Sequence, residues 1–172
     1  MKILVVSDNH SSSEELQNLV RRHQEEVECM VHCGDSEFDY DDSRMTSFQL
    51  RVRGNCDFDT RYPENVAETV GGKTVFATHG HLYGVKMNLM NLAYKAEETG
   101  ADLVCFGHSH EATVHFDSNI LFLNPGSISL PRKPTIKTYA IVEWVHDEVQ
   151  VVFYDHQGER VDELTKTYKL SS

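Results

Sequence analysis

The stretch LVCFGHSHEA (residues 103–112) places two imidazoles directly behind a buried strand. Its first four residues are apolar, which is typical of a short strand that is covered on both faces of a sheet. Gly107 ends the apolar run, and His108 and His110 follow it one residue apart. In open α/β sheets, ligands bind outside the carboxyl ends of the strands. This stretch therefore predicts such a sheet, with a ligand site at its strand ends.

Four other apolar runs end in polar residues of the same kind. The segments that follow them are SDNH (7–10), GD (34–35), GNCD (54–57) and HGH (79–81). Each segment alone is a common turn, but five adjacent strand ends would bring these loops together in space. Glycines in four of the five loops let the backbone turn sharply and approach a ligand closely.

On both sides of this stretch the pattern of elements is informative. Strands and amphipathic helices alternate in the first part of the chain, and only strands are predicted in the last third. We expect helices at 12–26, where serines supply a cap, and at 87–99, where Gly100 ends the helix. We expect strands at 2–7, 29–32, 48–52, 74–77, 102–106, 113–116, 120–123, 139–144 and 149–154. This order predicts one α/β domain over residues 1–172, with two mixed sheets packed face to face and helices outside.

Composition limits the partners of the protein. The formal net charge is -11 over 172 residues, without the basic patch that would bind a nucleic-acid polymer. No apolar run approaches the roughly 20 residues of a membrane span, and the N-terminal run is too short for a signal peptide. We therefore expect a cytoplasmic protein that does not bind membranes. Three of its four cysteines (Cys29, Cys33 and Cys105) lie in apolar runs and are expected to be buried and inert.

The polar residues of the five loops have the chemistry of metal ligands. Carboxylates, an amide and imidazoles suit Mn, Fe, Zn, Co or Ni better than Ca. One ion cannot use seven ligands and keep a site open for water, whereas two ions can, if one carboxylate bridges them. Paired ions serve displacement at phosphorus. In an extended segment, His108 and His110 would face one cleft and could ligate different ions. The candidate metal ligands are Asp8, His10, Asp35, Asn55, His79, His108 and His110.

The ordered segments SDNH, GD, GNCD, HGH and GHSH, followed by NPGS (124–127), resemble the calcineurin-like metallophosphoesterase superfamily. The short chain without a cap domain is most similar to its small YfcE-type phosphodiesterases, which are kin to the retromer subunit Vps29. The resemblance implies a four-layer α/β/β/α sandwich with two divalent ions. Mn²⁺ is the expected metal, and Ni²⁺, Co²⁺, Fe²⁺ and Zn²⁺ are alternatives. The implied ligands are Asp8, His10, Asp35 and His110 for the first ion, and bridging Asp35 with Asn55, His79 and His108 for the second.

The resemblance also implies an activity, the hydrolysis of a small phosphate diester by a hydroxide that the two ions hold. Asp35, Asn55, His79 and His108 would take part in catalysis. Cys56 stands where the larger family often has a histidine. A thiol is a poorer general acid at neutral pH than an imidazole, so we expect a preference for good leaving groups. Asp57 either orients a ligand or is a solvent-facing turn residue.

Several alternatives stay open from the sequence. A non-catalytic scaffold of the retromer-subunit kind would be expected to lose at least one ligand. A phosphomonoesterase or protein phosphatase is a third alternative, which the acidic surface and the absence of a histidine at position 56 disfavour. The strand-rich last third could bury a dimer edge. Asn124 and Ser127 either donate hydrogen bonds near the site or form a plain turn. We expect His32 in the core and the acidic segment 35–44 at the surface.

Overall fold

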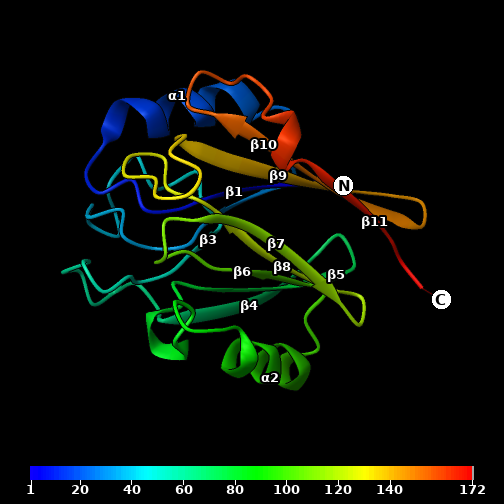
Figure 1. Cartoon of the computed structure of the whole chain (residues 1–172). Helices are drawn as coiled ribbons and strands as arrows, with labels where there is room; N and C mark the ends of the chain where they lie inside the picture. Colours follow the sequence, from blue (N-terminus) through cyan, green and yellow to red (C-terminus); the bar gives the residue numbers. More distant parts are fainter. Residues whose placement is uncertain (172) are drawn as a thin grey trace.

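The computed structural model describes residues 1–171, which form two β-sheets stacked between two helices (Figure 1). The elements are β1 (Lys2–Val6), α1 (Ser13–His23), β2 (Cys29–His32), β3 (Leu50–Arg51), β4 (Asn65–Val70), β5 (Lys73–Thr78), η1 (His81–Tyr83), α2 (Met90–Thr99), β6 (Leu103–Cys105), β7 (Ala112–Asp117), β8 (Ile120–Pro125), β9 (Thr138–Val145), β10 (Glu148–Asp155), η2 (Asp162–Leu164) and β11 (Lys166–Lys169).

Both sheets are mixed. The first has the order β11-β10-β9-β1-β2-β3, in which β1, β2 and β3 run parallel and β9 lies antiparallel to β1. The second has the order β4-β5-β6-β8-β7, with β5, β6 and β8 parallel. The parallel strands with the candidate ligand loops therefore lie at one end of the first sheet and in the centre of the second.

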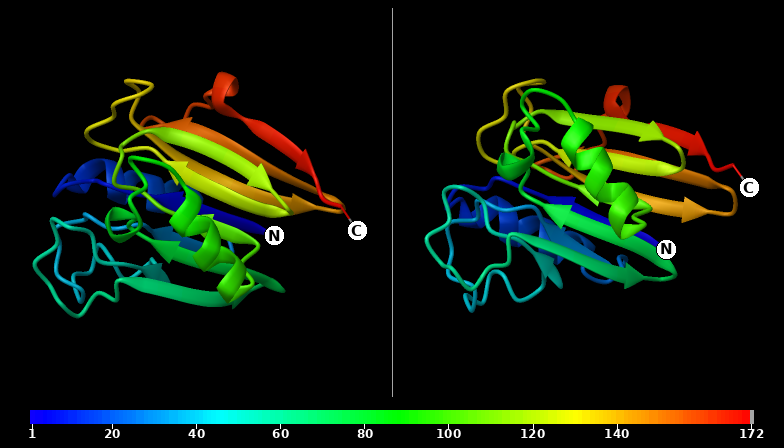
Figure 2. Two further views of the ribbon diagram at one scale, coloured as in Figure 1. Left: turned by 60° about the horizontal axis from the view of Figure 1, so that its bottom comes forward. Right: turned by 90° about the horizontal axis from the view of Figure 1, so that it is seen from below.

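Three apolar clusters hold the layers together. The cluster between the sheets includes Ile3 and Val31 from one sheet and Ala77 and Leu103 from the other. A second cluster joins α1 to the outer face of the first sheet, and a third joins α2 to the outer face of the second. The two sheets lie between the helices in Figure 1, and α2 lies in front of the strands when the molecule is seen from below (Figure 2). The expected four-layer sandwich is confirmed.

The bounds of several elements differ from the prediction. The strand expected at 48–52 pairs over Leu50–Arg51 only. Helix α2 begins at Met90 instead of Met87, because a turn occupies residues 84–87. Helix α1 is also shorter than predicted, and the Ser12 hydroxyl at its N-cap bonds Glu15 instead of a backbone amide. Strands β4 and β11 were not predicted. Both are edge strands without a long apolar run, and three of six residues in β4 and three of four in β11 are exposed.

Other predictions can be checked against burial. Cys29, Cys33, Cys105 and His32 are buried, as expected. The acidic segment is not all surface, because Asp35, Ser36 and Phe38 within it are buried. In residues 1–171, no helix is long and apolar enough to cross a membrane.

Candidate metal centre

Five loops meet at one end of the sandwich, and they come from both sheets. Three follow β1, β2 and β3 of the first sheet, and two follow β5 and β6 of the second. The backbone ties them together, because Asp8 N donates to Gly34 O at 3.1 Å and Gly107 N donates to His79 O at 3.0 Å. The predicted meeting of strand ends is confirmed, although the strands belong to two facing sheets instead of one.

Two buried carboxylates lie at the centre of these loops. Asp8 Oδ2 accepts hydrogen bonds from Ser7 Oγ at 2.5 Å and from His108 N at 3.1 Å. Asp35 Oδ1 accepts one from Cys56 N at 2.8 Å. The loop backbones therefore hold one oxygen of each carboxylate and leave the other oxygen to face the imidazoles.

Three imidazoles present their Nε2 atoms to these carboxylates. His79 Nδ1 lies 2.7 Å from Cys33 O, and His110 Nδ1 lies 2.7 Å from Leu130 O. A carbonyl can only accept a hydrogen bond, so each Nδ1 carries the proton and a neutral ring keeps its lone pair on Nε2. His10 Nδ1 lies 2.8 Å from Glu37 Oε2. Such outer partners orient the ring of a metal-binding histidine and fix its tautomer.

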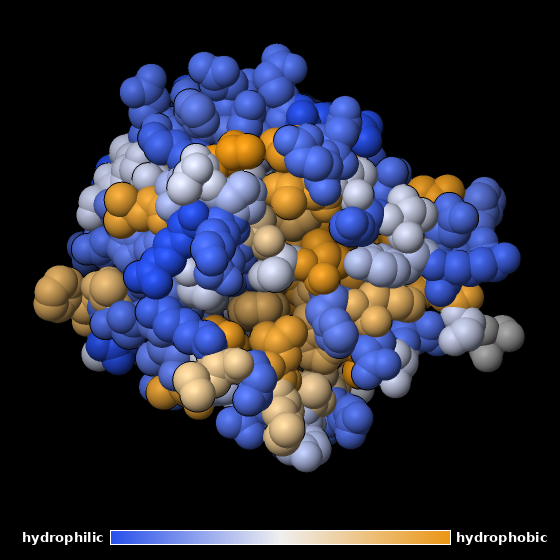
Figure 3. Space-filling model, viewed as in Figure 1, coloured by the Kyte–Doolittle hydropathy of each residue, from blue (hydrophilic) through white to orange (hydrophobic). Residues whose placement is uncertain are grey.

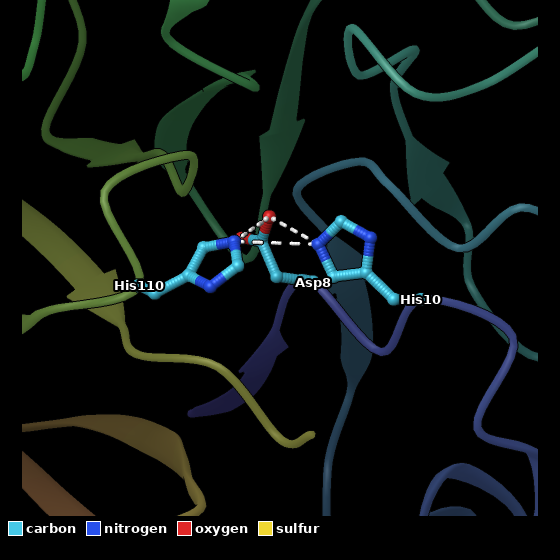
Figure 4. A group of neighbouring side chains, drawn as sticks. All are labelled: Asp8, His10 and His110. Carbon is cyan, nitrogen blue, oxygen red and sulfur yellow. Dashed lines mark hydrogen bonds and ion pairs between the residues drawn. The ribbon is translucent and has the colours of Figure 1, made fainter. Parts of the chain in front are cut away.

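The inward atoms form a compact group. Asp8 Oδ1 lies 3.2 Å from His110 Nε2, 3.5 Å from His10 Nε2 and 3.8 Å from His79 Nε2. The rings of His10 and His110 point toward the Asp8 carboxylate from opposite sides (Figure 4). Asp35 Oδ2 lies 3.1 Å from His79 Nε2 and 3.7 Å from His10 Nε2. Each carboxylate therefore faces imidazoles from more than one loop.

This group fits metal ions. Asp8 Oδ1 and His79 Nε2 are buried and lack a hydrogen-bond partner of acceptable geometry within residues 1–171. Buried polar atoms are rarely left without a partner. The ligand atoms of three sets lie within 4.8 Å of one another: Asp8 with His10 and His110, Asp8 with Asp35 and His79, and His10 with Asp35 and Cys56. Carboxylate and imidazole ligands suit divalent transition metals.

The backbone is strained where the ligands are attached. Five of the seven candidate ligands have positive φ, namely Asp8, His10, Asp35, His108 and His110. Left-handed backbone in residues other than glycine is costly and concentrates at functional sites. Close packing adds a second constraint, because a Cβ on Gly54 would lie 2.0 Å from Asp35 Oδ1, and one on Gly107 would lie 2.5 Å from Asp8 Oδ2. These glycines make room for the two carboxylates.

Proximity shifts the pKa values of these groups. Burial alone would raise the pKa of Asp8, but His10, His110 and His79 hold it well below its usual value. Asp8 in turn raises the pKa of His10 to about 9, against the effect of burial and with help from Glu37. Burial, followed by the charges of His79 and Lys86, lowers the pKa of His108 to about 4. The centre therefore favours negative carboxylates beside positive charge, as a metal ion would provide.

Among the predicted ligands with a carboxylate or imidazole side chain, only His108 lies outside these sets. His108 has a φ of 71° and His110 a φ of 59°, so the extended backbone expected for this loop was wrong. The ring centroid of His108 lies 5.1 Å from that of His79 and 6.0 Å from that of His81. Asn55 is exposed, and its amide donates to Cys56 Sγ at 3.6 Å.

The structure resolves two interpretations that the sequence left open. Asp57 is buried and accepts hydrogen bonds from the backbone amides of Asp35, Glu37 and Gly54 at 2.9, 2.8 and 2.7 Å, so it is not a solvent-facing turn residue. In the NPGS segment, Asn124 Nδ2 donates to Gly107 O at 3.1 Å and Ser127 Oγ donates to Asp8 O at 2.7 Å. These side chains support the ligand loops from behind.

Sequence reasoning missed the outer partners of the imidazoles. Glu37 lies within the segment that was expected at the surface. It is only two residues beyond the predicted ligand Asp35, and this short spacing could have indicated that Glu37 lies near the metal ligands. The carbonyls of Cys33 and Leu130 carry no side-chain signal, because any residue supplies a backbone oxygen.

Comparison with known proteins places this geometry in a family. The calcineurin-like phosphoesterase superfamily domain matches residues 1–147. The chain belongs to this superfamily. The probable metallophosphoesterase YsnB of Bacillus subtilis is 43% identical over 164 residues, which cover 95% of this chain and 96% of YsnB. Phosphodiesterase YfcE of Escherichia coli K12 is 28% identical over 117 residues, 63% of this chain and 59% of YfcE.

Solved structures share the fold. A predicted phosphoesterase from Streptococcus pneumoniae TIGR4 superposes with a TM-score of 0.93 at 34% identity, covering 98% of this chain and 97% of that one. Vacuolar protein sorting 29 from Cryptosporidium parvum has a TM-score of 0.76 at 16% identity, covering 99% of this chain and 98% of that one. The latter likeness concerns the fold alone. The predicted resemblance to the superfamily, its YfcE-type branch and the Vps29 fold is confirmed.

Proposed function

We propose that this protein is a metal-dependent phosphodiesterase that hydrolyses a small phosphate diester at a dinuclear centre. The observation that carries the proposal is the pair of buried carboxylates, Asp8 and Asp35, facing three imidazole Nε2 atoms. The probable metallophosphoesterase YsnB supports the reaction class, and the name of YfcE supports a diester as substrate.

Two sets of ligands would hold the ions, with Asp35 between them. Asp35 Oδ2 lies 3.7 Å from His10 Nε2 and 3.1 Å from His79 Nε2, one imidazole of each proposed set, which supports a bridging role. Asn55 would turn its amide away from Cys56 to join the second set. The proposed sets are Asp8, His10, Asp35 and His110 for the first ion, and Asp35, Asn55, His79 and His108 for the second. Mn²⁺ is proposed first, with Ni²⁺, Co²⁺, Fe²⁺ and Zn²⁺ as alternatives.

Bound divalent ions lower the pKa of water and neutralise negative charge on a phosphoryl group. In the overall reaction, the oxygen of water bonds to phosphorus and the bond from phosphorus to one ester oxygen breaks. That oxygen leaves with a proton. The chain itself fixes the ligand geometry. Ser7 donates a hydrogen bond to Asp8 and Gly107 packs closely against it, while Asp57 accepts hydrogen bonds from the amides of Asp35 and Gly54.

The decisive experiment measures hydrolysis of bis(4-nitrophenyl) phosphate by chelator-treated protein, with and without added Mn²⁺. We expect metal-dependent turnover in the wild type and a loss of at least about 100-fold in His79→Asn, because loss of an outer partner alone costs about 10–100-fold. His146→Asn is the matched control, since His146 is exposed in the turn between β9 and β10. A folded, metal-loaded protein without turnover on any of the five ions would refute the proposal and favour the scaffold alternative suggested by the Vps29 fold.

The leaving group should matter strongly. Cys56 lies at the rim of the centre, and burial followed by the charges of Asp35 and Glu37 raises its pKa to about 11. A thiol of such a high pKa is a weak general acid at neutral pH. We expect 4-nitrophenyl esters to be hydrolysed far faster than alkyl esters, and Cys56→His to raise the alkyl rate by about tenfold, towards the lower range of general acid catalysis. Equal rates for aryl and alkyl esters in the wild type would contradict this role.

A further inference from the structure

A cleft lies beside the proposed metal centre, between the outer face of the second sheet and residues 85–89, the segment that leads into α2. It has a volume of about 640 Å³, and we call it the α2–β7 cleft. It exists because one helix, about 10 Å wide, cannot cover a five-stranded sheet whose strands lie about 4.8 Å apart. Helix α2 leaves the edge formed by β8 and β7 partly open, and Figure 3 shows apolar surface gathered there.

The cleft begins at the loops that carry candidate ligands. Ser109 and Glu111, which flank His110, form part of its wall. Arg132 also lines it, and the backbone amide of Arg132 donates to His110 O at 3.0 Å. Lys86 also lines the cleft, and it lies on the segment that continues from the His79–His81 loop. A group bound at the metal centre could therefore extend directly into the cleft.

The lining combines an apolar floor with two cations. Leu89, Phe106 and Phe122 supply apolar and aromatic surface. In a chain of net charge -11, Lys86 and Arg132 are both exposed at the cleft. Among residues 1–171, neither of them forms a salt bridge, and Glu111 is the one carboxylate that shares the lining with them. Cations and aromatic side chains in one cleft fit a ring that carries negative charge.

The far end of the cleft sets the orientation of such a group. A second hollow of about 230 Å³ shares Leu89, His115 and Phe122 with the cleft and continues along α2. Its lining includes Glu97 and Asp117. These carboxylates would repel an anion, so a negative group is directed to the end beside Lys86 and Arg132, next to the metal centre.

We propose that the α2–β7 cleft binds the second ester group of the phosphodiester substrate, and that this group is an aromatic ring with an additional negative charge. The cleft volume lies within the range of small-molecule sites, roughly 300–1,000 Å³, and far exceeds the needs of a methyl ester. This inference rests on the proposed function, because it assigns the substrate class of the same centre.

The test uses three diesters with the same 4-nitrophenolate leaving group and with methyl, phenyl or 3-carboxyphenyl as the second ester group. With Mn²⁺ present, we expect kcat/KM for the phenyl ester to exceed that for the methyl ester by about tenfold, from partial burial of the ring. The 3-carboxyphenyl ester should gain about threefold more, and Lys86→Gln or Arg132→Gln should remove that gain.

Blocking the cleft provides the matched comparison. Thr113 is exposed on the edge strand β7 and lines the cleft, whereas Thr167 is exposed on β11, the edge strand of the other sheet. We expect Thr113→Trp to bring the ratio of phenyl to methyl rates close to one and Thr167→Trp to leave it unchanged. An unchanged ratio in a folded Thr113→Trp variant, or a wild-type ratio near one, would overturn the inference.

Calorimetry separates this inference from the proposed function. In Mn²⁺-loaded protein, 3-carboxyphenyl phosphate should bind at least about tenfold more tightly than methyl phosphate, and Thr113→Trp should abolish the difference. If no diester is hydrolysed but this binding pattern is found, the cleft assignment stands and the phosphodiesterase proposal fails. If diesters are hydrolysed but the two phosphates bind equally, the cleft assignment fails alone.

Discussion

The space between the sheets and the loops at their ends are built from the same strands but in opposite ways. Between the sheets, Val5 and Val31 lie in regular strands, are fully buried and contact other apolar side chains. A few residues further on, Asp8 and Asp35 are equally buried, but they are charged and have left-handed backbone. Apolar burial stabilises the fold, whereas buried charge and backbone strain cost stability. The difference teaches that the ligand loops are held in shape by the strands and are organised for binding.

The largest expected effect comes from exchanging a ligand oxygen. Asp35→Asn keeps the shape of the side chain but removes its charge, so activity should fall by more than about 100-fold, beyond the loss from an outer partner. Folding should change by less than about 1 kcal/mol, because Asp8 still faces the imidazoles. Kinetics and denaturant unfolding measure both quantities.

A core substitution should give the opposite result. Val31→Ala leaves a cavity between the sheets, so stability should fall by about 2 kcal/mol while metal affinity changes little. If Asp35→Asn unfolded the protein and Val31→Ala abolished metal binding, the division between the two regions would be wrong.

A smaller loss of metal affinity is expected when Asp57, which binds the backbone of the ligand loops, is replaced. Asp57 accepts hydrogen bonds from the amides of Asp35, Glu37 and Gly54, and an amide side chain cannot replace all of them. Asp57→Asn should weaken Mn²⁺ binding by about 10–100-fold, in the range for lost outer partners. Asp59→Asn, in the same loop, is the control, because Asp59 pairs with Arg61 away from the ligands. An equal loss of Mn²⁺ affinity in the two variants would show that Asp57 does not position the ligand loops.

A smaller effect tests the close packing behind Asp8. A methyl group on Gly107 would lie 2.1 Å from Ser7 Oγ and 2.5 Å from Asp8 Oδ2, so Gly107→Ala should cost about 2 kcal/mol and weaken metal binding. Gly100→Ala is the comparison, because it strains a left-handed C-cap with nothing within 4 Å. It should cost about 1 kcal/mol and leave metal affinity intact. Thermal unfolding with and without Mn²⁺ separates the two.

The smallest effect is a dependence of stability on pH. In metal-free protein, Asp8 raises the pKa of His10 from 6.5 to about 9. The folded state therefore binds the His10 proton more tightly than the unfolded state does. The contribution of protonated His10 to the free energy of unfolding is complete below pH 6.5 and is lost as pH rises to about 9. After allowance for solvent screening, we expect the free energy of unfolding to fall by about 1–2 kcal/mol between pH 6.5 and 9. The fall should be smaller in the His10→Gln variant.

Metal should reverse that trend. Protons compete with ions for His10, so Mn²⁺-loaded protein should gain stability as pH rises from 6.5 to 9. Urea unfolding at several pH values, with chelator or with Mn²⁺, measures both slopes. Parallel slopes in the two conditions would contradict the assignment of His10 to the metal centre.

Much of the fold and site could be predicted because apolar runs and the polar residues behind them are local signals. The paired sheets and the meeting of Asp8, Asp35 and His79 follow from strand ends alone. The orientation of the His108 side chain could not be predicted, because nothing in the surrounding sequence indicates that this residue has a left-handed backbone. The edge strands β4 and β11 were missed because neither contains a long apolar run.

The most direct test of the central claim is electron paramagnetic resonance of Mn²⁺-loaded protein, combined with metal analysis. The claim is that Asp35 lies between two ions. We predict two Mn²⁺ per chain with the spectrum of a spin-coupled pair, and loss of the coupling in Asp35→Asn. A single, uncoupled Mn²⁺ per chain in the folded wild type would contradict the dinuclear centre and the phosphodiesterase mechanism built on it.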